Sequence, residues 1–129
     1  MEQTLTANKR TFEVKAGVFT TYISNQKNIL EENISLYEIE DEDGNTRISD
    51  NCEMQELLEK QFKLDADLAY KACSPIAASY CVDLRKTEDG KLEIFTMVNK
   101  DIFTCLDQVL SCLIKINQVA EMSLELEEE

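Results

Sequence analysis

Residues 101–122 read DIFTCLDQVLSCLIKINQVAEM and predict one long amphipathic helix. Apolar side chains recur there at intervals of four and three residues, which places them on one face of an α-helix: Ile102, Leu106, Val109, Leu113, Ile116 and Ala120. More apolar residues widen this stripe, with Cys105, Cys112 and Val119 on one flank and Phe103, Leu110 and Ile114 on the other. A surface helix needs an apolar stripe of only about 100°. The helix is therefore expected to be covered on two sides.

Two arrangements would cover so wide a stripe. The helix can lie centrally against a sheet and other helices, or part of its apolar face can meet another chain. In the second arrangement the candidate oligomer interface consists of Phe103, Leu110 and Ile114, and the assembly is a homodimer.

Segments typical of β-strands precede the helix. Residues 79–85 and 91–98 alternate in polarity on either side of a turn at Thr87-Glu88-Asp89-Gly90, which predicts a hairpin. Residues 11–24 are rich in β-branched and aromatic side chains and predict one long strand or two short ones, with Gly17 as a bulge or turn. Residues 34–39 and 46–48 predict a further pair of strands around Asp43-Gly44-Asn45.

Two shorter helices are expected between the strands. Asp50 is the predicted N-cap of a helix over 51–63, with Glu53 as its partner in a capping box. A second helix is expected over 65–73, and Ser74-Pro75 should end it because proline lacks the amide donor. The sequence leaves 75–82 open between helix and strand.

These elements predict an α+β fold. A small, mainly antiparallel sheet should form from segments near 11–24, 34–48, 79–85 and 91–98, with the helices packed on one face. Residues 1–10 are expected to be a flexible N-terminus, 11–122 a single domain and 123–129 an acidic tail that frays at the helix end. The order of the strands stays open.

Composition favours one intracellular domain. The chain has 129 residues, of which 43% are hydrophobic, enough for a single packed core. Its N-terminus lacks the pattern of an export signal, and no continuous apolar run approaches the ~20 residues that cross a bilayer. Five unpatterned cysteines without export predict reduced, mostly buried thiols. The expected location is the cytoplasm.

Residue types that carry catalysis are scarce. The chain contains no histidine, only three glycines and no pair of cysteines at metal-binding spacing, so we expect no catalytic residue, no metal site and no cofactor. Asp41-Glu42-Asp43-Gly44-Asn45 resembles part of a calcium loop, but aligning Gly44 with the loop glycine puts Ile39 at the first ligand position. A solvated turn between strands explains the same residues.

Charge is the most informative bulk property. The net charge is −13, and two stretches hold nearly all the excess: 31–60 with two basic and eleven acidic residues, and 101–129 with one basic and seven acidic residues. The densest cluster comprises Glu31, Glu32, Glu38, Glu40, Asp41, Glu42 and Asp43. This cluster is either a solvated surface that keeps the chain soluble or a docking surface for a basic site on another protein.

The functional expectation is a non-enzymatic protein-binding module. It would dock on the basic, nucleic-acid-binding surface of a polymerase, nuclease, repressor or guide-RNA effector, as a phage-type DNA mimic does, without binding nucleic acid or membrane itself. A dimeric chaperone or immunity-type protein that uses the apolar face of helix 101–122 is the alternative. A small enzyme that depends on carboxylates and a metal ion is a minor alternative.

Overall fold

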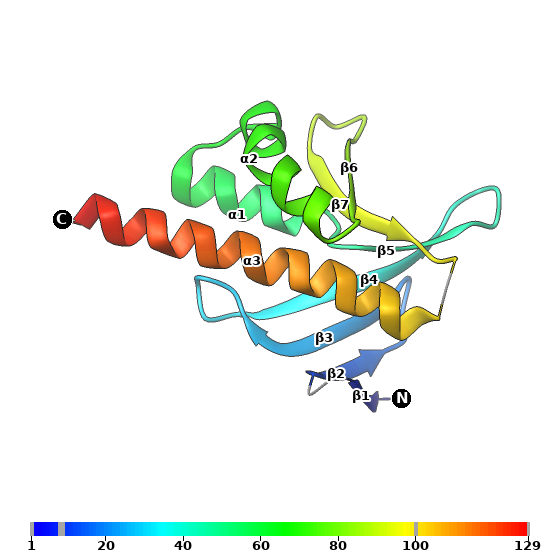
Figure 1. Ribbon diagram of the computed structural model, residues 1–129. Helices are drawn as coiled ribbons and strands as arrows, with labels where there is room; N and C mark the ends of the chain where they lie inside the picture. Colours follow the sequence, from blue (N-terminus) through cyan, green and yellow to red (C-terminus); the bar gives the residue numbers. More distant parts are fainter. Residues whose placement is uncertain (1, 8–9, 100, 129) are drawn as a thin grey trace.

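Five of the strands follow one another as successive hairpins. Within residues 2–7, 10–99 and 101–128, which the computed structural model describes, the chain forms seven strands in one antiparallel sheet and three helices (Figure 1). The successive strands are β1 (Glu2–Ala7), β2 (Arg10–Lys15), β3 (Thr20–Lys27), β4 (Asn33–Glu40) and β5 (Thr46–Ser49). In β2, β3 and β4, buried apolar residues alternate with more exposed residues, as a sheet with one buried face requires.

The chain then leaves the sheet and returns to it. Helices α1 (Glu53–Phe62) and α2 (Ala66–Ser79) precede a hairpin of β6 (Asp83–Lys86) and β7 (Leu92–Met97). Strand β7 pairs antiparallel with β5, so the strand order is β1-β2-β3-β4-β5-β7-β6. The last element, α3, spans Ile102–Glu128. The α+β class predicted from the sequence is therefore correct.

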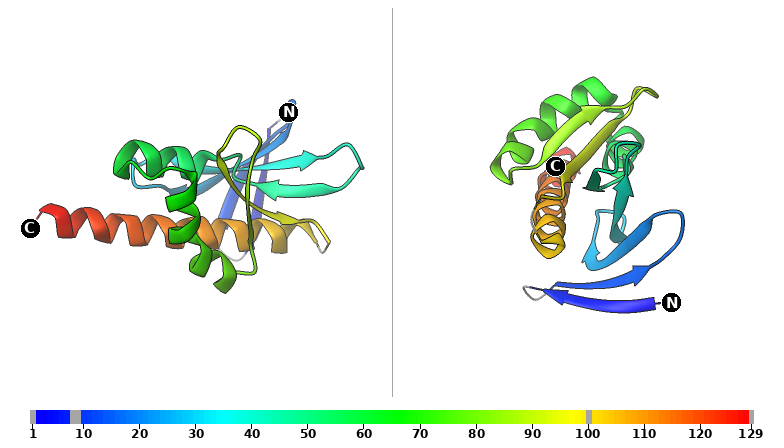
Figure 2. Two further views of the ribbon diagram at one scale, coloured as in Figure 1. Left: turned by 90° about the horizontal axis from the view of Figure 1, so that it is seen from above. Right: turned by 90° about the vertical axis from the view of Figure 1, so that its right-hand side faces the viewer.

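Helix α3 lies at the centre of the core. The sheet curls around it on one side, and α2 lies against it on the other (Figure 2). Leu106, Val109 and Leu110 are completely inaccessible to solvent. At the rim of the sheet, Arg10 of β2 reaches α3, where it pairs with the Asp107 carboxylate at 3.0 Å and donates to the Ser111 hydroxyl at 2.7 Å. Of the two arrangements that the wide apolar stripe allows, the central one is observed.

Helix α1 occupies a different layer from α2 and α3. Seen from above, α2 and α3 lie in front of the sheet, whereas α1 lies level with β4 and β5, beyond the point where β5 ends (Figure 2). Met54, Leu57 and Leu58 of α1 are buried in the common core. The helix therefore extends the sheet layer and leaves a gap beside β4.

Several expectations about the strands are confirmed. Residues 11–24 form two strands, with Gly17 in the turn between them. The turn at 43–45 joins β4 to β5, and Gly44 adopts the φ of +83° that favours glycine. The hairpin around Thr87–Gly90 is also present, although β6 begins only at Asp83. Tyr80–Val82 form a turn and loop rather than strand, because α2 extends to Ser79.

Four local expectations need correction. Strand β1 forms in the segment 1–10, for which no regular element was predicted. The N-cap of α1 is Cys52 rather than Asp50, and the Glu53 carboxylate bonds Tyr37 instead of closing a capping box. Pro75 does not end α2, because Lys71 and Pro75 lie on its exposed side, where water can replace the lost hydrogen bond. Helix α3 continues to Glu128, through most of the acidic tail assigned to 123–129.

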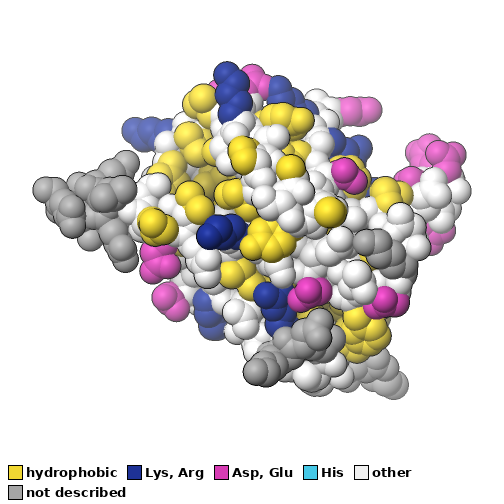
Figure 3. Space-filling view, in the orientation of Figure 1, with side chains coloured by type: hydrophobic (Ala, Val, Ile, Leu, Met, Phe, Trp, Pro, Cys, Tyr) yellow, Lys and Arg dark blue, Asp and Glu magenta, His cyan; other side chains and the backbone are white. Residues whose placement is uncertain are grey.

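The candidate oligomer interface is mostly interior. Leu110 is fully buried against the chain's own core, and Ile114 is partly buried there, while Phe103 is 40% exposed. Apolar side chains gather at the centre of the face formed by α2 and α3, with Lys and Arg among and around them (Figure 3). All five cysteines are free, and all but Cys81 are buried.

Helix α3 is long and apolar enough over Ile102–Ser123, by length and composition alone, to cross a membrane. The sequence has no continuous apolar run long enough to cross a bilayer, so no such segment was expected. Helix α3 is nevertheless long and apolar enough on average, because polar residues are interspersed among its apolar ones. The same segment supplies the fully buried Cys105, Leu106 and Val109 of the core. Its apolar character is therefore accounted for by packing, which is consistent with a soluble protein.

Replacing Leu110 tests whether the apolar stripe serves the core or an interface. We expect Leu110→Ala to lower the free energy of unfolding by about 2–5 kcal/mol, because a buried leucine leaves a cavity. Phe103→Ala is the control and should cost much less. Urea unfolding followed by circular dichroism suits this chain, which lacks tryptophan. Equal costs for the two variants would contradict the central placement of α3.

Candidate functional site

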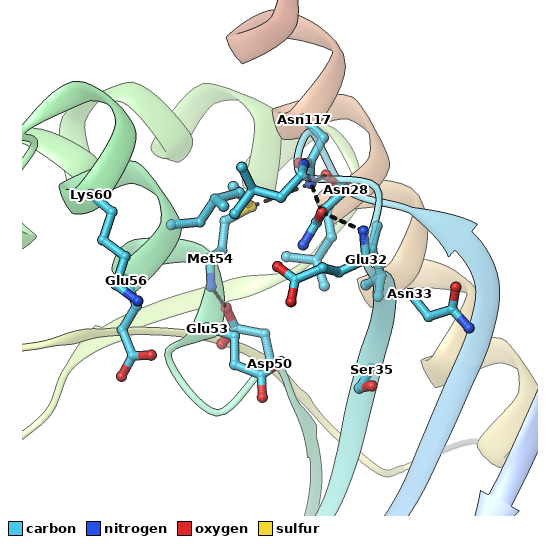
Figure 4. A pocket seen from close by; sticks show the side chains of 14 residues that line it. Asn28, Glu32, Asn33, Ser35, Asp50, Glu53, Met54, Glu56, Lys60 and Asn117 are labelled. Carbon is cyan, nitrogen blue, oxygen red and sulfur yellow. Dashed lines mark hydrogen bonds between the residues drawn. The ribbon is translucent and has the colours of Figure 1, made fainter.

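A concavity lies between strand β4 and helix α1. Strand β5 pairs only with Tyr37–Glu40, so the first half of β4, residues 33–36, has no strand partner on that side within the described chain. Helix α1 runs opposite this open edge, and α3 lies behind the gap (Figure 4). The resulting cavity has a volume of about 320 Å³. This volume falls in the range of about 300–1,000 Å³ that is usual for ligand sites.

The lining of this cavity combines an apolar floor with acidic walls. Apolar side chains come from the β3–β4 loop and from three elements, with Ile34 in β4, Met54 and Leu57 in α1 and Leu113 in α3. Carboxylates come from the β3–β4 loop and from the start of α1. We call the cavity the acidic groove, and its polar lining consists of Asn28, Glu32, Asn33, Ser35, Asp50, Glu53, Glu56, Lys60 and Asn117.

The β3–β4 loop is held in place by two asparagines. The side-chain oxygen of Asn28 accepts from the backbone amides of Leu30 at 2.8 Å and Glu32 at 3.1 Å. Asn117 of α3 accepts from the amide of Ile29 at 3.0 Å and donates to the carbonyl of Leu113 at 2.8 Å. Because Asn117 is almost fully buried, these bonds fix the loop to the core helix. The loop wall of the acidic groove is thus preorganised.

Asp50 fixes the opposite end of the groove. Its side chain is 1% exposed and accepts three backbone hydrogen bonds, from Cys52 at 3.0 Å, Met54 at 3.1 Å and Ile94 at 3.0 Å. These bonds join the end of β5, the start of α1 and strand β7. Burial raises the pKa of Asp50 to about 7, although the three amide donors favour the ionised form and oppose the shift.

The other carboxylates of the groove differ in how they are engaged. Glu53 accepts a hydrogen bond from the Tyr37 hydroxyl, and burial raises the pKa of the Glu53 carboxyl. Glu56 pairs with Lys91 at 2.9 Å. The carboxylate of Glu32 makes no hydrogen bond or ion pair with the described residues, and it points into the gap (Figure 4). Glu32 is therefore the carboxylate most available to a bound cation.

The acidic cluster predicted from the sequence is divided by the fold. Glu31 and Glu32 lie in the loop before β4, whereas Asp41, Glu42 and Asp43 lie in the turn after it. Strand β4 has eight residues, so these groups are roughly 25 Å apart at about 3.3 Å per residue. Between them, Glu38 accepts from the Tyr22 hydroxyl at 2.8 Å, and Glu40 is exposed at the strand end.

The turn after β4 has its own internal structure. One carboxylate oxygen of Asp41 accepts from the amides of Asp43 and Asn45, both at 2.9 Å. This Asx-type arrangement explains Asp41 as a turn residue. Glu42 and Asp43 remain exposed at the tip.

The sequence alone does not predict the acidic groove. Its local pattern indicates Glu53 as a capping residue, and nothing in it associates Glu56 or Asp50 with Glu32, because these residues are 18–24 positions apart in the chain. The available signal was the acidic start of α1, which holds Glu53 and Glu56 in its first turn. Nothing in the sequence showed that β5 would end before covering the first half of β4.

A second buried carboxylate lies outside the groove. Glu93 of β7 is 2% exposed and receives hydrogen bonds from Ser49, Arg47 and Arg85. Burial alone would raise the pKa of Glu93, but these donors outweigh it and hold the pKa below its ordinary value. This cluster holds β5, β6 and β7 together, and that stabilising role is sufficient to account for the buried carboxylate.

An apolar depression lies between the three helices. It has a volume of about 110 Å³, and its lining includes Phe62 of α1, Ile76 of α2 and Val119 of α3. Val119 is 43% exposed, and the neighbouring Met122 is 62% exposed. We call this feature the helical depression.

The chain has no detected likeness to known proteins. No family model matches it, and neither a characterised protein nor a solved structure matches it. The function of the chain is therefore inferred from its own geometry.

The pH dependence of stability tests the role of Asp50. Asp50→Asn should lower the free energy of unfolding by about 1–3 kcal/mol, because an amide group replaces one acceptor of a buried backbone N–H. The folded pKa of Asp50, about 7, lies above the ordinary 3.8. The folded state therefore holds the proton more tightly, and this contribution to stability is fully present below pH 3.8 and is lost as the pH rises through about 7.

Asparagine does not titrate, so the stability advantage of the wild type over Asp50→Asn should shrink as the pH rises from 3.8 to about 7. Urea unfolding of both proteins at several pH values measures this difference, and the effects of the other carboxylates cancel. An advantage that grew with pH across this window would contradict the assignment.

Proposed function

We propose that this chain is a non-enzymatic, cytoplasmic protein-binding module that occupies a basic, nucleic-acid-binding surface of its partner. The observation that carries the proposal is the placement of carboxylates at both ends of β4, with the acidic groove at one end and the exposed tip of Glu42 and Asp43 at the other. The partner class is a polymerase, nuclease, repressor or guide-RNA effector.

The spacing of these groups suits a surface that binds nucleic acid. Duplex DNA carries one negative charge per about 1.7 Å of helix axis, so a protein that grips it presents cations over tens of ångströms. Two carboxylate groups roughly 25 Å apart, at about 3.3 Å per strand residue, can engage such a surface at two places. Binding of this kind excludes nucleic acid by competition for the same cations.

The excess of negative charge supports fast, selective encounter. A net charge of −13 attracts basic surfaces and repels nucleic acid and anionic membranes. Electrostatic complementarity mainly raises the association rate and the specificity, and it weakens as salt screens the charges. The complex is therefore expected to dissociate at high ionic strength.

Charge reversal at the exposed tip tests the proposal. The variant Glu40→Lys, Glu42→Lys, Asp43→Lys should lose the partner in affinity purification from the native cell, because its charges would repel a basic surface. The wild type should retain the partner at about 0.1 M salt and release it at about 1 M, where the Debye length falls from about 10 to 3 Å. The captured protein should bind nucleic acid, and the wild-type chain should displace that nucleic acid.

The matched control reverses three exposed acids elsewhere, Asp83→Lys at the start of β6 and Glu88→Lys and Asp89→Lys in the β6–β7 turn. This control should keep the partner although its net charge changes equally. Circular dichroism confirms that both variants fold. Equal retention by the two variants at low salt would refute a specific role for the tip.

The helical depression favours a second candidate function, a dimeric chaperone or immunity-type binding protein. Val119 and Met122 present exposed apolar surface beside it. If the chain has this second function, it should sediment as a dimer at high concentration in sedimentation velocity. Val119→Glu should convert that dimer to monomer. Gln118→Glu, on the adjacent exposed position, is the control. A chain that stays monomeric at millimolar concentration would remove the candidate.

A further inference from the structure

The acidic groove combines an unpaired stretch of strand edge with a facing helix and carboxylates on both walls. We infer that it binds an extended segment of the partner by adding it to the open edge of β4, with one arginine side chain of that segment held between the loop and α1 carboxylates. The inference rests on the proposed function and identifies the part of the partner that enters the groove.

The open edge of β4 can pair with another extended chain. A strand edge presents backbone N–H and C=O groups that can pair with another chain. The edge of β4 is covered by β5 along Tyr37–Glu40 and is left uncovered along 33–36, where the groove begins. A segment that enters there would continue the line of β5. Helix α1 would form the opposite wall, as in other sites that bind peptides between a strand edge and a helix.

The carboxylates of the groove can bind a cationic side chain. Glu32 comes from the β3–β4 loop, and Glu53 and Glu56 come from the facing wall of α1. Acceptors on two opposing walls match the planar fork of a guanidinium, which carries five N–H donors in fixed directions. The apolar floor of Ile34 and Met54 can cover the aliphatic part of an arginine side chain. Charge-assisted hydrogen bonds of this kind are stronger than those between neutral groups.

The groove suits one cationic side chain rather than a run of them. Lys60 also lines the α1 wall and adds a positive charge to the site. Asp50 is committed to three backbone amides, and Glu56 already pairs with Lys91. The carboxylate left free of partners in the described chain is that of Glu32. A second cation of the same segment would therefore meet Lys60 without an acid to balance it.

Capped pentapeptides provide the probes. The first is acetyl-Ser-Val-Arg-Val-Ser-amide, and the second replaces arginine by citrulline, which keeps the shape and removes the charge. Titration into the full chain, followed by amide NMR shifts, should give saturable changes at 33–36, at Glu53 and at Asn117. We expect the citrulline peptide to bind about tenfold more weakly, because it loses the charge-assisted hydrogen bonds. A third peptide, N-methylated at both valines, should also lose affinity because it cannot pair with the strand edge.

Variants locate the binding site. Glu32→Gln with Glu53→Gln should weaken binding of the arginine peptide about tenfold and leave the citrulline peptide unchanged. The control, Glu42→Gln with Asp43→Asn, removes two charges at the tip and should change the affinity less than about twofold, because exposed and distant charges are screened. Glutamine can still accept the Tyr37 hydrogen bond at position 53, so the fold should persist.

The possible outcomes separate this inference from the proposed function. Equal binding of the arginine and citrulline peptides, or shifts confined to residues outside the groove, would overturn the inference. If the peptide did not bind while the full chain still captured a basic partner through Glu40, Glu42 and Asp43, the inference alone would fail. If that capture also failed, the proposed function would fall with it.

Discussion

Three backbone amides converge on the carboxylate of Asp50, and the shape of the molecule around β4 follows from that convergence. The amide of Asp50 still bonds the Ile94 carbonyl, while its carboxylate binds the amide of Ile94 and two amides at the start of α1, so the chain turns away from the sheet at this residue. Strand β5 is therefore too short to cover the first half of β4, and α1 lies beyond its end. A buried acid that organises backbone turns thus creates both the open strand edge and the gap opposite it.

The buried apolar residues of this chain stabilise the fold, whereas its exposed acidic residues are those proposed to bind a partner. Helix α3 gathers the core, with the sheet on one side and α2 on the other, and its fully buried residues explain its apolar length. Among the acids whose side chains the structure describes, Asp50 and Glu93 are the buried ones, and their carboxylates are satisfied by backbone amides or by Arg and Ser donors. The other described acids are partly or fully exposed, where their mutual repulsion is tolerated and their field reaches solvent.

Much of the fold could be predicted because its signals are local. The apolar spacing of 101–122, the glycine turns at Gly44 and Gly90 and the alternation of the strands all act within a few residues. The signal for β1 is weak, since a polar segment becomes a strand only by pairing with β2. The prediction that Pro75 ends α2 was wrong, because the effect of a proline depends on which side of the helix faces water. The acidic groove depends on where β5 ends, which the tertiary bonds of Asp50 decide, so no local pattern predicted it.

We propose above that the uncovered edge of β4 receives a basic, extended segment. Hydrogen–deuterium exchange of the amides in 33–36 tests it directly, in the free chain and in the chain saturated with an arginine-containing peptide. We expect some of these amides to exchange rapidly when the edge is open and slowly once a segment pairs with it, while the amides of α2 stay unchanged. Protection that appeared only on the α2–α3 face, with 33–36 unaffected, would contradict it.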